Sequence, residues 1–292
     1  MATPRNLGQW TLGDALGGGR SAQVWAATDP EGREAAIKVV RQERGRRVED
    51  GVRFLREGRL LSDLDHPAIP RLYEMGVAGA DQMFLAIERI PGKDLRTVLT
   101  RLAKREIELR RSVRTALLLP AWQAACAAVA HAHERGIVHG DVTPSNIVAD
   151  GQGRFGLVDW GLARRFDPPD PPEPRPEHDG KRPVLRVHGT PGYVAPERLS
   201  RPLEQPLPPS DVYSLGAVLY HLLCFAPAFT ARTIPGRLAA SFQAPTDPRE
   251  RAPAMEVPDA LAEAALRAMA VEPGDRYPSA AALGEAVTAA LA

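Results

Sequence analysis

The sequence predicts an α+β protein of two lobes, with strands and one helix in the N-terminal lobe and a larger, mainly helical C-terminal lobe. Short apolar or alternating runs bounded by turn residues fill the first ninety positions, as is typical of strands. Beyond them, longer stretches repeat apolar residues every three or four positions, as in amphipathic helices. The change falls near 88–92, so we place the lobes at 1–90 and 91–292.

Individual elements follow from the same periodicity. Strands are expected at 10–16, 23–28, 35–40, 71–75 and 84–90, and a helix is expected at 48–64. Pro120 is expected to open a helix as a first-turn residue, and Ser210 or Asp211 to cap the apolar helix that ends near Cys224. Two more helices are expected at 259–270 and 279–290. Residues 168–176 contain six prolines in nine positions, which favours an extended, mobile loop.

Composition excludes several classes of partner. With 37 basic and 36 acidic side chains, the net charge is +1, so we expect neither nucleic acid nor an anionic membrane as a partner. Neither a signal sequence nor an apolar stretch long enough to span a bilayer is visible. Two cysteines, Cys126 and Cys224, lie in apolar stretches, as buried free thiols do. We therefore expect a cytoplasmic protein.

A glycine cluster and a lysine suggest a phosphate site in the first lobe. Gly17, Gly18 and Gly19 lie between two predicted strands, where backbone N–H groups can approach phosphate oxygens. Lys38 ends an apolar strand that follows, and Glu57 on the next helix is placed to pair with it. Taken alone, the cluster is more often a turn, and this lysine and glutamate are more often surface residues.

The second lobe contributes two carboxylates and an amide. Asp141 and Asn146 stand five residues apart, and Asp159 follows an apolar strand farther along. Phosphoryl transfer requires a carboxylate that orients the attacking hydroxyl and hard oxygen ligands for Mg²⁺. The segment 189–197 then runs Gly-Thr-Pro-Gly-Tyr-Val-Ala-Pro-Glu, with Asp211 and Arg276 downstream.

With these motifs in this order, the chain resembles protein kinases, most closely the bacterial ones that are similar to eukaryotic Ser/Thr kinases. The resemblance covers about residues 8–290. It implies a bilobal protein kinase-like fold, with a small antiparallel sheet and one helix in the N-lobe. It further implies transfer of the γ-phosphate of ATP to Ser or Thr of protein substrates, with Mg²⁺, which Mn²⁺ can replace.

The resemblance also implies roles for individual residues. Asp141 would be the catalytic base, Glu57 would position Lys38, and Thr190 beside Asp141 would favour aliphatic hydroxyls. Asn146 and Asp159 would bind the metal. Residues implied in catalysis are Lys38, Glu57, Asp141, Asn146 and Thr190. Residues implied in nucleotide binding are Leu16, Gly17, Gly19, Val24, Ala36, Lys38, Glu88, Ile90, Val148 and Asp159, with Ile87 behind the hinge.

Supporting roles are implied outside the cleft. Glu197 would pair with Arg276 and anchor the end of the activation segment, and Asp211 would brace the catalytic loop from beneath. His139 would pack under that loop and is not expected to be a metal ligand.

Four positions depart from the family pattern. Ala22 replaces the third glycine of the loop, and Trp160 replaces a phenylalanine but can still pack near Leu61. Thr143 replaces a lysine that contacts the γ-phosphate, a charge that Arg164 is a candidate to supply. Gly140 replaces the arginine that receives an activation-loop phosphate.

The loop also has no side chain that could carry the phosphate which such an arginine would bind. Residues 160–189 contain no Ser, Thr or Tyr. The arginine that would bind the phosphate and the residue that would carry it are both absent, so we expect activation without phosphorylation of that loop. Control by a regulatory protein partner is then an alternative source of regulation, and no sequence feature specifies an oligomeric state.

Two other functions remain open from the sequence. Thr143 and Ala22 are compatible with a pseudokinase, a nucleotide-binding scaffold that transfers little or nothing. The His-Gly-Asp motif with a following asparagine also occurs in small-molecule phosphotransferases such as antibiotic and choline kinases. The segment 189–197 argues against these, because it resembles a platform that docks an extended polypeptide.

Overall fold

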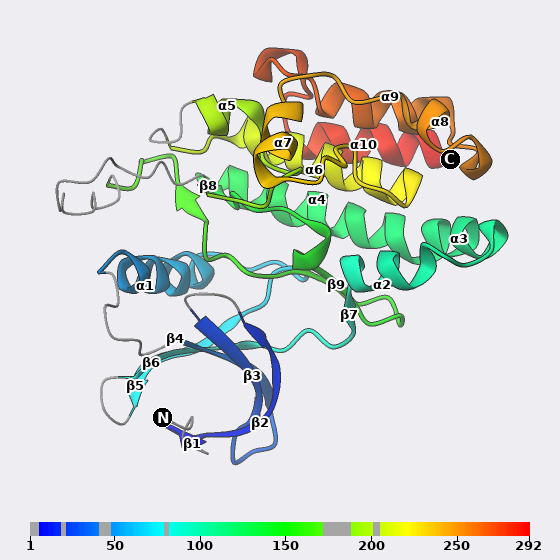
Figure 1. Ribbon diagram of the computed structural model, residues 1–292. Helices are drawn as coiled ribbons and strands as arrows, with labels where there is room; N and C mark the ends of the chain where they lie inside the picture. Colours follow the sequence, from blue (N-terminus) through cyan, green and yellow to red (C-terminus); the bar gives the residue numbers. More distant parts are fainter. Residues whose placement is uncertain (1–5, 19–21, 41–47, 79–81, 172–187, 201–204) are drawn as a thin grey trace.

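The computed structural model describes residues 6–18, 22–40, 48–78, 82–171, 188–200 and 205–292. It has a small lobe built on a sheet and a large lobe built of helices (Figure 1). The elements of the small lobe are β1 (Asn6–Leu7), β2 (Trp10–Gly18), β3 (Ala22–Thr28), β4 (Glu34–Val40), α1 (Val48–Ser62), β5 (Leu72–Ala78) and β6 (Gln82–Glu88).

The large lobe begins with β7, which pairs with β9 of the same lobe. Its helices are α2 (Leu95–Leu102), α3 (Ile107–Val113), a π-helical turn (Arg114–Leu118), α4 (Leu119–Glu134), α5 (Pro196–Ser200), α6 (Pro208–Cys224), α7 (Ile234–Ala240), α8 (Pro248–Arg251), α9 (Asp259–Ala268) and α10 (Ala280–Leu291). Its short strands are β7 (Lys93–Asp94), β8 (Ile137–Val138), β9 (Ile147–Ala149), β10 (Phe155–Leu157) and β11 (Arg164–Arg165).

The small-lobe sheet has six strands in the order β1-β2-β3-β4-β6-β5, and every neighbouring pair is antiparallel. The expected antiparallel sheet with one helix is thus confirmed, as are its five expected strands. β1 was not expected, because a two-residue strand carries no periodic signal. One face of the sheet covers a core that includes Trp10, Ile37 and Phe84. On the other side, Phe54 of α1 packs with Val40 and Leu85.

The large lobe has a single extensive core, in which α4 and α6 are central. Tyr213, Leu215 and Leu219 of α6 are fully buried, as is Trp122 of α4, whose indole Nε1 donates to the carbonyl of Leu215 over 2.9 Å. The run Ile107–Glu134 is, among the described residues, long and apolar enough to cross a membrane by length and composition. Half of its most apolar window is buried inside the protein, as in a core helix.

One expectation for the large lobe is confirmed and two are wrong. Pro120 lies in the first turn of α4, as expected, although helical structure already begins at Ile107. A π-helical turn at Arg114–Leu118 precedes it and fits a residue that cannot donate the regular backbone bond. Neither Ser210 nor Asp211 caps α6, whose N-cap is Leu207 without a side-chain bond.

The expectation for the proline-rich segment is also wrong for its described part, which ends at Pro171. Phe166 bridges to Pro169, and the backbone N–H of Asp170 donates to the carbonyl of Arg165 over 2.9 Å. These residues form a compact turn on the large lobe and not the expected extended loop. Residues 172–176 of the segment lie outside the described residues.

Candidate active site

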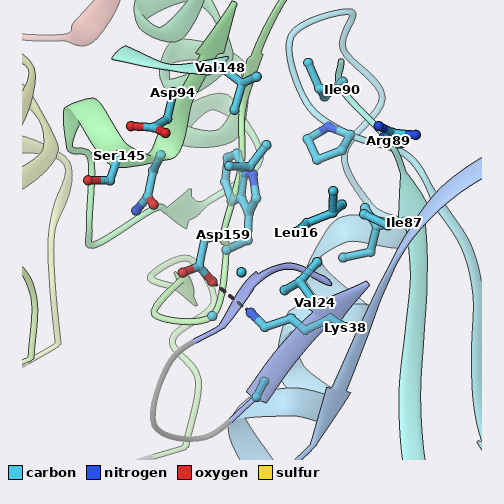
Figure 2. A pocket seen from close by; sticks show the side chains of 18 of the residues that line it. Leu16, Val24, Lys38, Ile87, Arg89, Ile90, Asp94, Ser145, Val148 and Asp159 are labelled. Atoms are coloured by element: carbon cyan, nitrogen blue, oxygen red, sulfur yellow. Dashed lines mark hydrogen bonds and ion pairs between the residues drawn. The ribbon is translucent and has the colours of Figure 1, made fainter. Parts of the chain in front are cut away.

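A cleft of about 920 Å³ lies between the lobes, and residues of both line it (Figure 2). The residues expected at the site that line this cleft are Leu16, Gly17, Val24, Ala36, Lys38, Glu57, Glu88, Ile90, Asp141, Asn146, Val148 and Asp159. Gly19 lies outside the described residues. Thr190 is not part of the lining but binds Asp141 directly.

The strand β4 delivers Lys38 to the cleft. Successive side chains of a strand alternate between its faces, so Ile37 and Val39 enter the core while Ala36 and Lys38 face the cleft. On the neighbouring β3, Val24 is the direct partner of Lys38 in the register. The antiparallel pairing therefore places the apolar side chain of Val24 beside the charged side chain of Lys38.

Lys38 is the centre of an ion-pair network that joins the two lobes. Its Nζ donates to Oε1 and Oε2 of Glu57 on α1 and to Oδ1 of Asp159, each over 2.8 Å (Figure 2 shows the last). Burial would lower the pKa of Lys38, but the two carboxylates outweigh it and raise this pKa. Lys38 in turn holds the pKa of Asp159 below its ordinary value.

Gly161 allows this network to form. A Cβ atom at this position would lie 3.2 Å from Oδ1 of Asp159 and 3.3 Å from both Oε2 of Glu57 and Nζ of Lys38. A larger residue would crowd all three charged groups. Asp159 itself has a left-handed backbone, with φ of 61°, a strained conformation that occurs mainly at functional positions.

Apolar side chains line the opposite end of the cleft. Leu16, Val24 and Ile87 approach it from the small lobe, and Val148 faces them from β9 (Figure 2). The segment between β6 and β7 passes along this end and contributes Ile90. Apolar side chains from both lobes at this end of the cleft suit a planar aromatic ring.

The loop between β8 and β9 carries Asp141 and Asn146. Oδ1 of Asp141 accepts from the Thr190 backbone N–H over 2.9 Å and from its Oγ1 over 2.8 Å. Nδ2 of Asn146 donates to the Asp141 carbonyl over 2.9 Å. Burial raises the pKa of Asp141, while the two bonds from Thr190 act in the opposite direction. Thr190 therefore supports the ionised carboxylate.

The carboxylate of Asp211 on α6 holds this loop in place, as expected. Asp211 is fully buried, and its carboxylate accepts from the backbone N–H groups of His139 and Gly140 over 2.8 and 2.9 Å. Nε2 of His133 lies 2.9 Å from the same carboxylate. Gly140 has φ of 77°, and a Cβ there would lie 2.9 Å from the Leu162 carbonyl, so the backbone favours glycine at this position.

His139 packs under the same loop, as expected, and both of its ring nitrogens lie close to backbone groups. Its Nδ1 accepts from the Asp141 backbone N–H over 3.2 Å, and its Nε2 lies 3.3 Å from the Val158 carbonyl. Its ring stacks edge-on against Trp160, with centroids 4.6 Å apart. Burial lowers the pKa of His139, which suits a neutral ring that donates through Nε2.

Asn146 and Asp159 fit a hard divalent cation. The Nδ2 group of Asn146 is committed to the Asp141 carbonyl, which leaves its Oδ1 as an acceptor. Oδ1 of Asp159 binds Lys38, and 56% of its side chain is exposed, so Oδ2 remains for a metal. Mg²⁺ is typically held by one or two such protein oxygens together with water and substrate phosphates.

The segment after Thr190 is anchored to the large lobe. Arg276, with 0% of its side chain exposed, donates to both carboxylate oxygens of Glu197 over 2.8 and 2.7 Å. The same guanidinium donates to the carbonyls of Pro209 and Val271. The expected pair is confirmed. Together with the bonds of Thr190 to Asp141, it fixes residues 190–197, here called the platform, beside Asp141.

The tyrosine of this platform has a neutral partner. The Tyr193 hydroxyl lies 2.7 Å from Nδ1 of His221 on α6, and Ser214 donates to the Tyr193 carbonyl over 2.8 Å. Burial lowers the pKa of His221 to about 4 and raises that of Tyr193 to about 12. Both side chains are therefore uncharged at neutral pH.

Comparison with known proteins agrees with this geometry. The model of the protein kinase domain matches residues 10–277. The chain belongs to the protein kinase family. It is 31% identical over 284 residues to a probable serine/threonine-protein kinase of Corynebacterium efficiens, CE0033, across 94% of this chain and 40% of that protein. It is 32% identical over 288 residues to the serine/threonine-protein kinase PknD of Chlamydia pneumoniae, across 94% of this chain and 30% of that protein.

A similar match extends to the PknD of Protochlamydia amoebophila, which is 32% identical over 279 residues, across 91% of this chain and 28% of that protein. This member of the protein kinase family thus spans less than half the length of these relatives.

Sequence reasoning missed some residues of the kinase cleft. Asp94 lines it and also caps α2, where its carboxylate accepts from the Thr97 N–H over 2.8 Å. The signal was a helix-capping aspartate soon after the hinge. Arg53 and Arg89 line the cleft as well, and no motif marked them. Ser145 also lines the cleft; it belongs to the motif that contains Asp141 and Asn146 but was given no role.

The expectation that Arg164 replaces the lysine that contacts the γ-phosphate is wrong. Arg164 lies on β11, does not line the cleft, and donates through Nη2 to the Pro171 carbonyl over 2.7 Å. Thr143, at the position of that lysine, is buried and also absent from the lining. Among described residues that line the cleft, the cations are Lys38, Arg53, Arg89 and Lys93.

Proposed function

We propose that this kinase transfers the γ-phosphoryl group of ATP to serine or threonine hydroxyls of protein substrates, with Mg²⁺ in the cleft. The observation that carries the proposal is the convergence of Lys38, Asp159 and Asp141 on one cleft beside an anchored peptide platform. The names of the relatives, all serine/threonine-protein kinases, support the choice of acceptor.

Each group has a physical role in such a transfer. The cation of Lys38 would hold the α- and β-phosphates, and Glu57 fixes its position. Asn146 and Asp159 would hold Mg²⁺, which neutralises charge on the phosphates when bound. Asp141 would accept the proton of the substrate hydroxyl as its oxygen bonds to the γ-phosphorus and the bond to the leaving ADP breaks. ATP as donor is consistent with a cytoplasmic location.

The platform favours a polypeptide acceptor over a small molecule. Thr190 binds Asp141, and the residues up to Glu197 are held by Arg276, so an extended chain can lie across the base. A single experiment tests the acceptor class: purified protein with ATP and Mg²⁺ is offered Ser/Thr peptides, Tyr peptides and an aminoglycoside, and products are identified by mass spectrometry. Modified serine or threonine is expected. Modified aminoglycoside with unmodified peptide would refute the proposal.

A nucleotide-binding scaffold is the second candidate, favoured by one observation. Thr143, which is buried, stands where the family pattern implies a lysine for the γ-phosphate. The intact network of Lys38, Glu57 and Asp159 supports the active enzyme instead, because a scaffold has no need of a catalytic geometry. ATP binding without transfer to any of the acceptors above would favour the scaffold.

The pH profile should report the bond between Thr190 and Asp141. Asp141 must be ionised to accept a proton, so activity falls as pH drops through its pKa, which burial raises. Thr190→Val removes a hydrogen bond that stabilises the carboxylate, so this pKa rises further. The acid limb of kcat/KM should shift to higher pH in Thr190→Val and keep its wild-type position in Thr190→Ser. An unshifted limb in Thr190→Val would contradict the assignment.

Activity should not depend on phosphorylation of the loop formed by residues 160–189. Residues 160–189 offer no phosphate acceptor, and the Lys38–Glu57 pair is formed in the unmodified chain. Treatment with a broad-specificity phosphatase, followed by its removal, should leave kcat within about twofold of the untreated enzyme. Loss of most of the activity would overturn this expectation.

A further inference from the structure

The turn at the start of the proline-rich stretch, residues 165–170, is fixed to the large lobe. The backbone N–H of Phe166 donates to the Gly136 carbonyl over 2.6 Å, and Arg165 pairs with Ile137 as part of β11 and β8. Nη1 of Arg165 donates to the Arg135 carbonyl over 3.0 Å. The turn therefore moves with the large lobe.

Asp170 closes this turn. Its Oδ2 accepts from the Arg165 backbone N–H over 2.8 Å, and its own N–H donates to the Arg165 carbonyl over 2.9 Å. The side chain of Gln205 donates to the Asp170 carbonyl. Backbone bonds thus hold the Asp170 carboxylate in place without any modification of the chain.

The same carboxylate reaches the small lobe. Oδ2 of Asp170 lies 3.6 Å from Nε of Arg56 on α1, and 11% and 18% of the Arg56 and Asp170 side chains are exposed. Arg56 directly precedes Glu57, the partner of Lys38. A second contact of the turn, from Arg165 to Asp63, lies just beyond the end of α1 and is more exposed, so it contributes less.

We propose that Asp170 is a built-in substitute for an activation-loop phosphate, a fixed anion of the large lobe that binds Arg56 and holds α1 where Glu57 meets Lys38. This inference rests on the proposed kinase function. It explains how the Lys38–Glu57 pair forms in a chain that has Gly140 in place of the phosphate-receiving arginine and no acceptor in residues 160–189. Asp170 and Arg56 are positioning residues, because they act through α1.

Single neutral substitutions test the contact. Asp170→Asn keeps side-chain size, Arg56→Gln shortens the side chain, and each removes one charge. Each should lower kcat/KM for ATP about tenfold, the effect of losing one charge-assisted contact, and should leave KM for the peptide unchanged. Each should also speed hydrogen exchange of the α1 backbone amides. Arg56→Lys retains the charge and should recover most of the activity.

The double variant distinguishes a specific pair from two independent effects. If Asp170 and Arg56 act on each other, the double variant loses about the same tenfold as either single variant, not the product of the two. Asp247→Asn is the matched control: Asp247 is also paired with an arginine, Arg249, and has 21% of its side chain exposed, but it caps the N-terminus of α8, away from α1 (Figure 1). It should match wild type in activity and in α1 exchange.

Three results would overturn the proposal: single variants that match wild type in both readouts, losses that multiply in the double variant, or lost activity with unchanged α1 exchange. If wild type itself transfers no phosphate, the proposed function fails. The exchange measurement then still decides whether the Asp170–Arg56 contact holds α1.

Discussion

Asp141→Asn should lower kcat about 10³-fold while ATP binding is retained, because the amide cannot accept the proton of the attacking hydroxyl. The substitution preserves size, and an amide oxygen can still accept from Thr190, which donates over 2.9 Å from its backbone and 2.8 Å from its hydroxyl. Structure around the loop should therefore persist. Steady-state kinetics with a peptide substrate measure the loss, and calorimetric titration with ATP measures binding.

The control for this substitution is Asp150→Asn. Asp150 accepts from the backbone N–H groups of Gln152 and Arg154 in an exposed hairpin and does not line the cleft. Its substitution should leave kcat unchanged. A fall of less than tenfold in Asp141→Asn would mean that Asp141 is not the base.

Lys38→Met should both abolish transfer and destabilise the fold. Glu57 has 3% of its side chain exposed, and its Oε2 lies 2.8 Å from Nζ of Lys38. The substitution therefore leaves a buried carboxylate without its cation. Breaking one side of a buried ion pair costs about 3–5 kcal/mol of unfolding free energy. Urea unfolding measures this loss, and the rise in KM for ATP measures the lost phosphate contact.

The second substitution Glu57→Gln in the Lys38→Met background separates the two effects. A neutral amide does not need a partner cation, so the free energy of unfolding should partly recover while transfer stays absent. Lys104→Met, at an exposed lysine of the large lobe, should change neither quantity. A stable and active Lys38→Met variant would show that this lysine does not hold the nucleotide.

Local periodicity was sufficient to predict most of the small lobe. The alternation in β4 gives both the core face with Ile37 and Val39 and the cleft face with Lys38, because strand geometry alone determines which side chains share a face. The motif residues of the large lobe meet at the cleft as expected, since each lies at the end of a short strand or in a tight turn.

Contacts between segments far apart in the chain could not be predicted in this way. Asp211 is of a residue type that often caps helices, and only the resemblance to protein kinases indicated its contact with the catalytic loop, where its carboxylate binds the backbone of His139 and Gly140. Asp170 lies among prolines that suggest a loose loop, yet it is fixed by Arg165 and reaches Arg56. In both cases the partner that decides the role is set by tertiary packing, which overrides local propensity.

We infer that Lys38, Asp141 and Asp159 act together on one triphosphate. This joint action is tested most directly by transfer of ³²P from γ-labelled ATP to a Ser/Thr peptide with Mg²⁺, in wild type, Lys38→Met, Asp141→Asn and Asp159→Asn. We predict label on serine or threonine with wild type and nearly none with any of the three variants. Equal transfer by wild type and the variants, or no transfer by wild type, would contradict the claim.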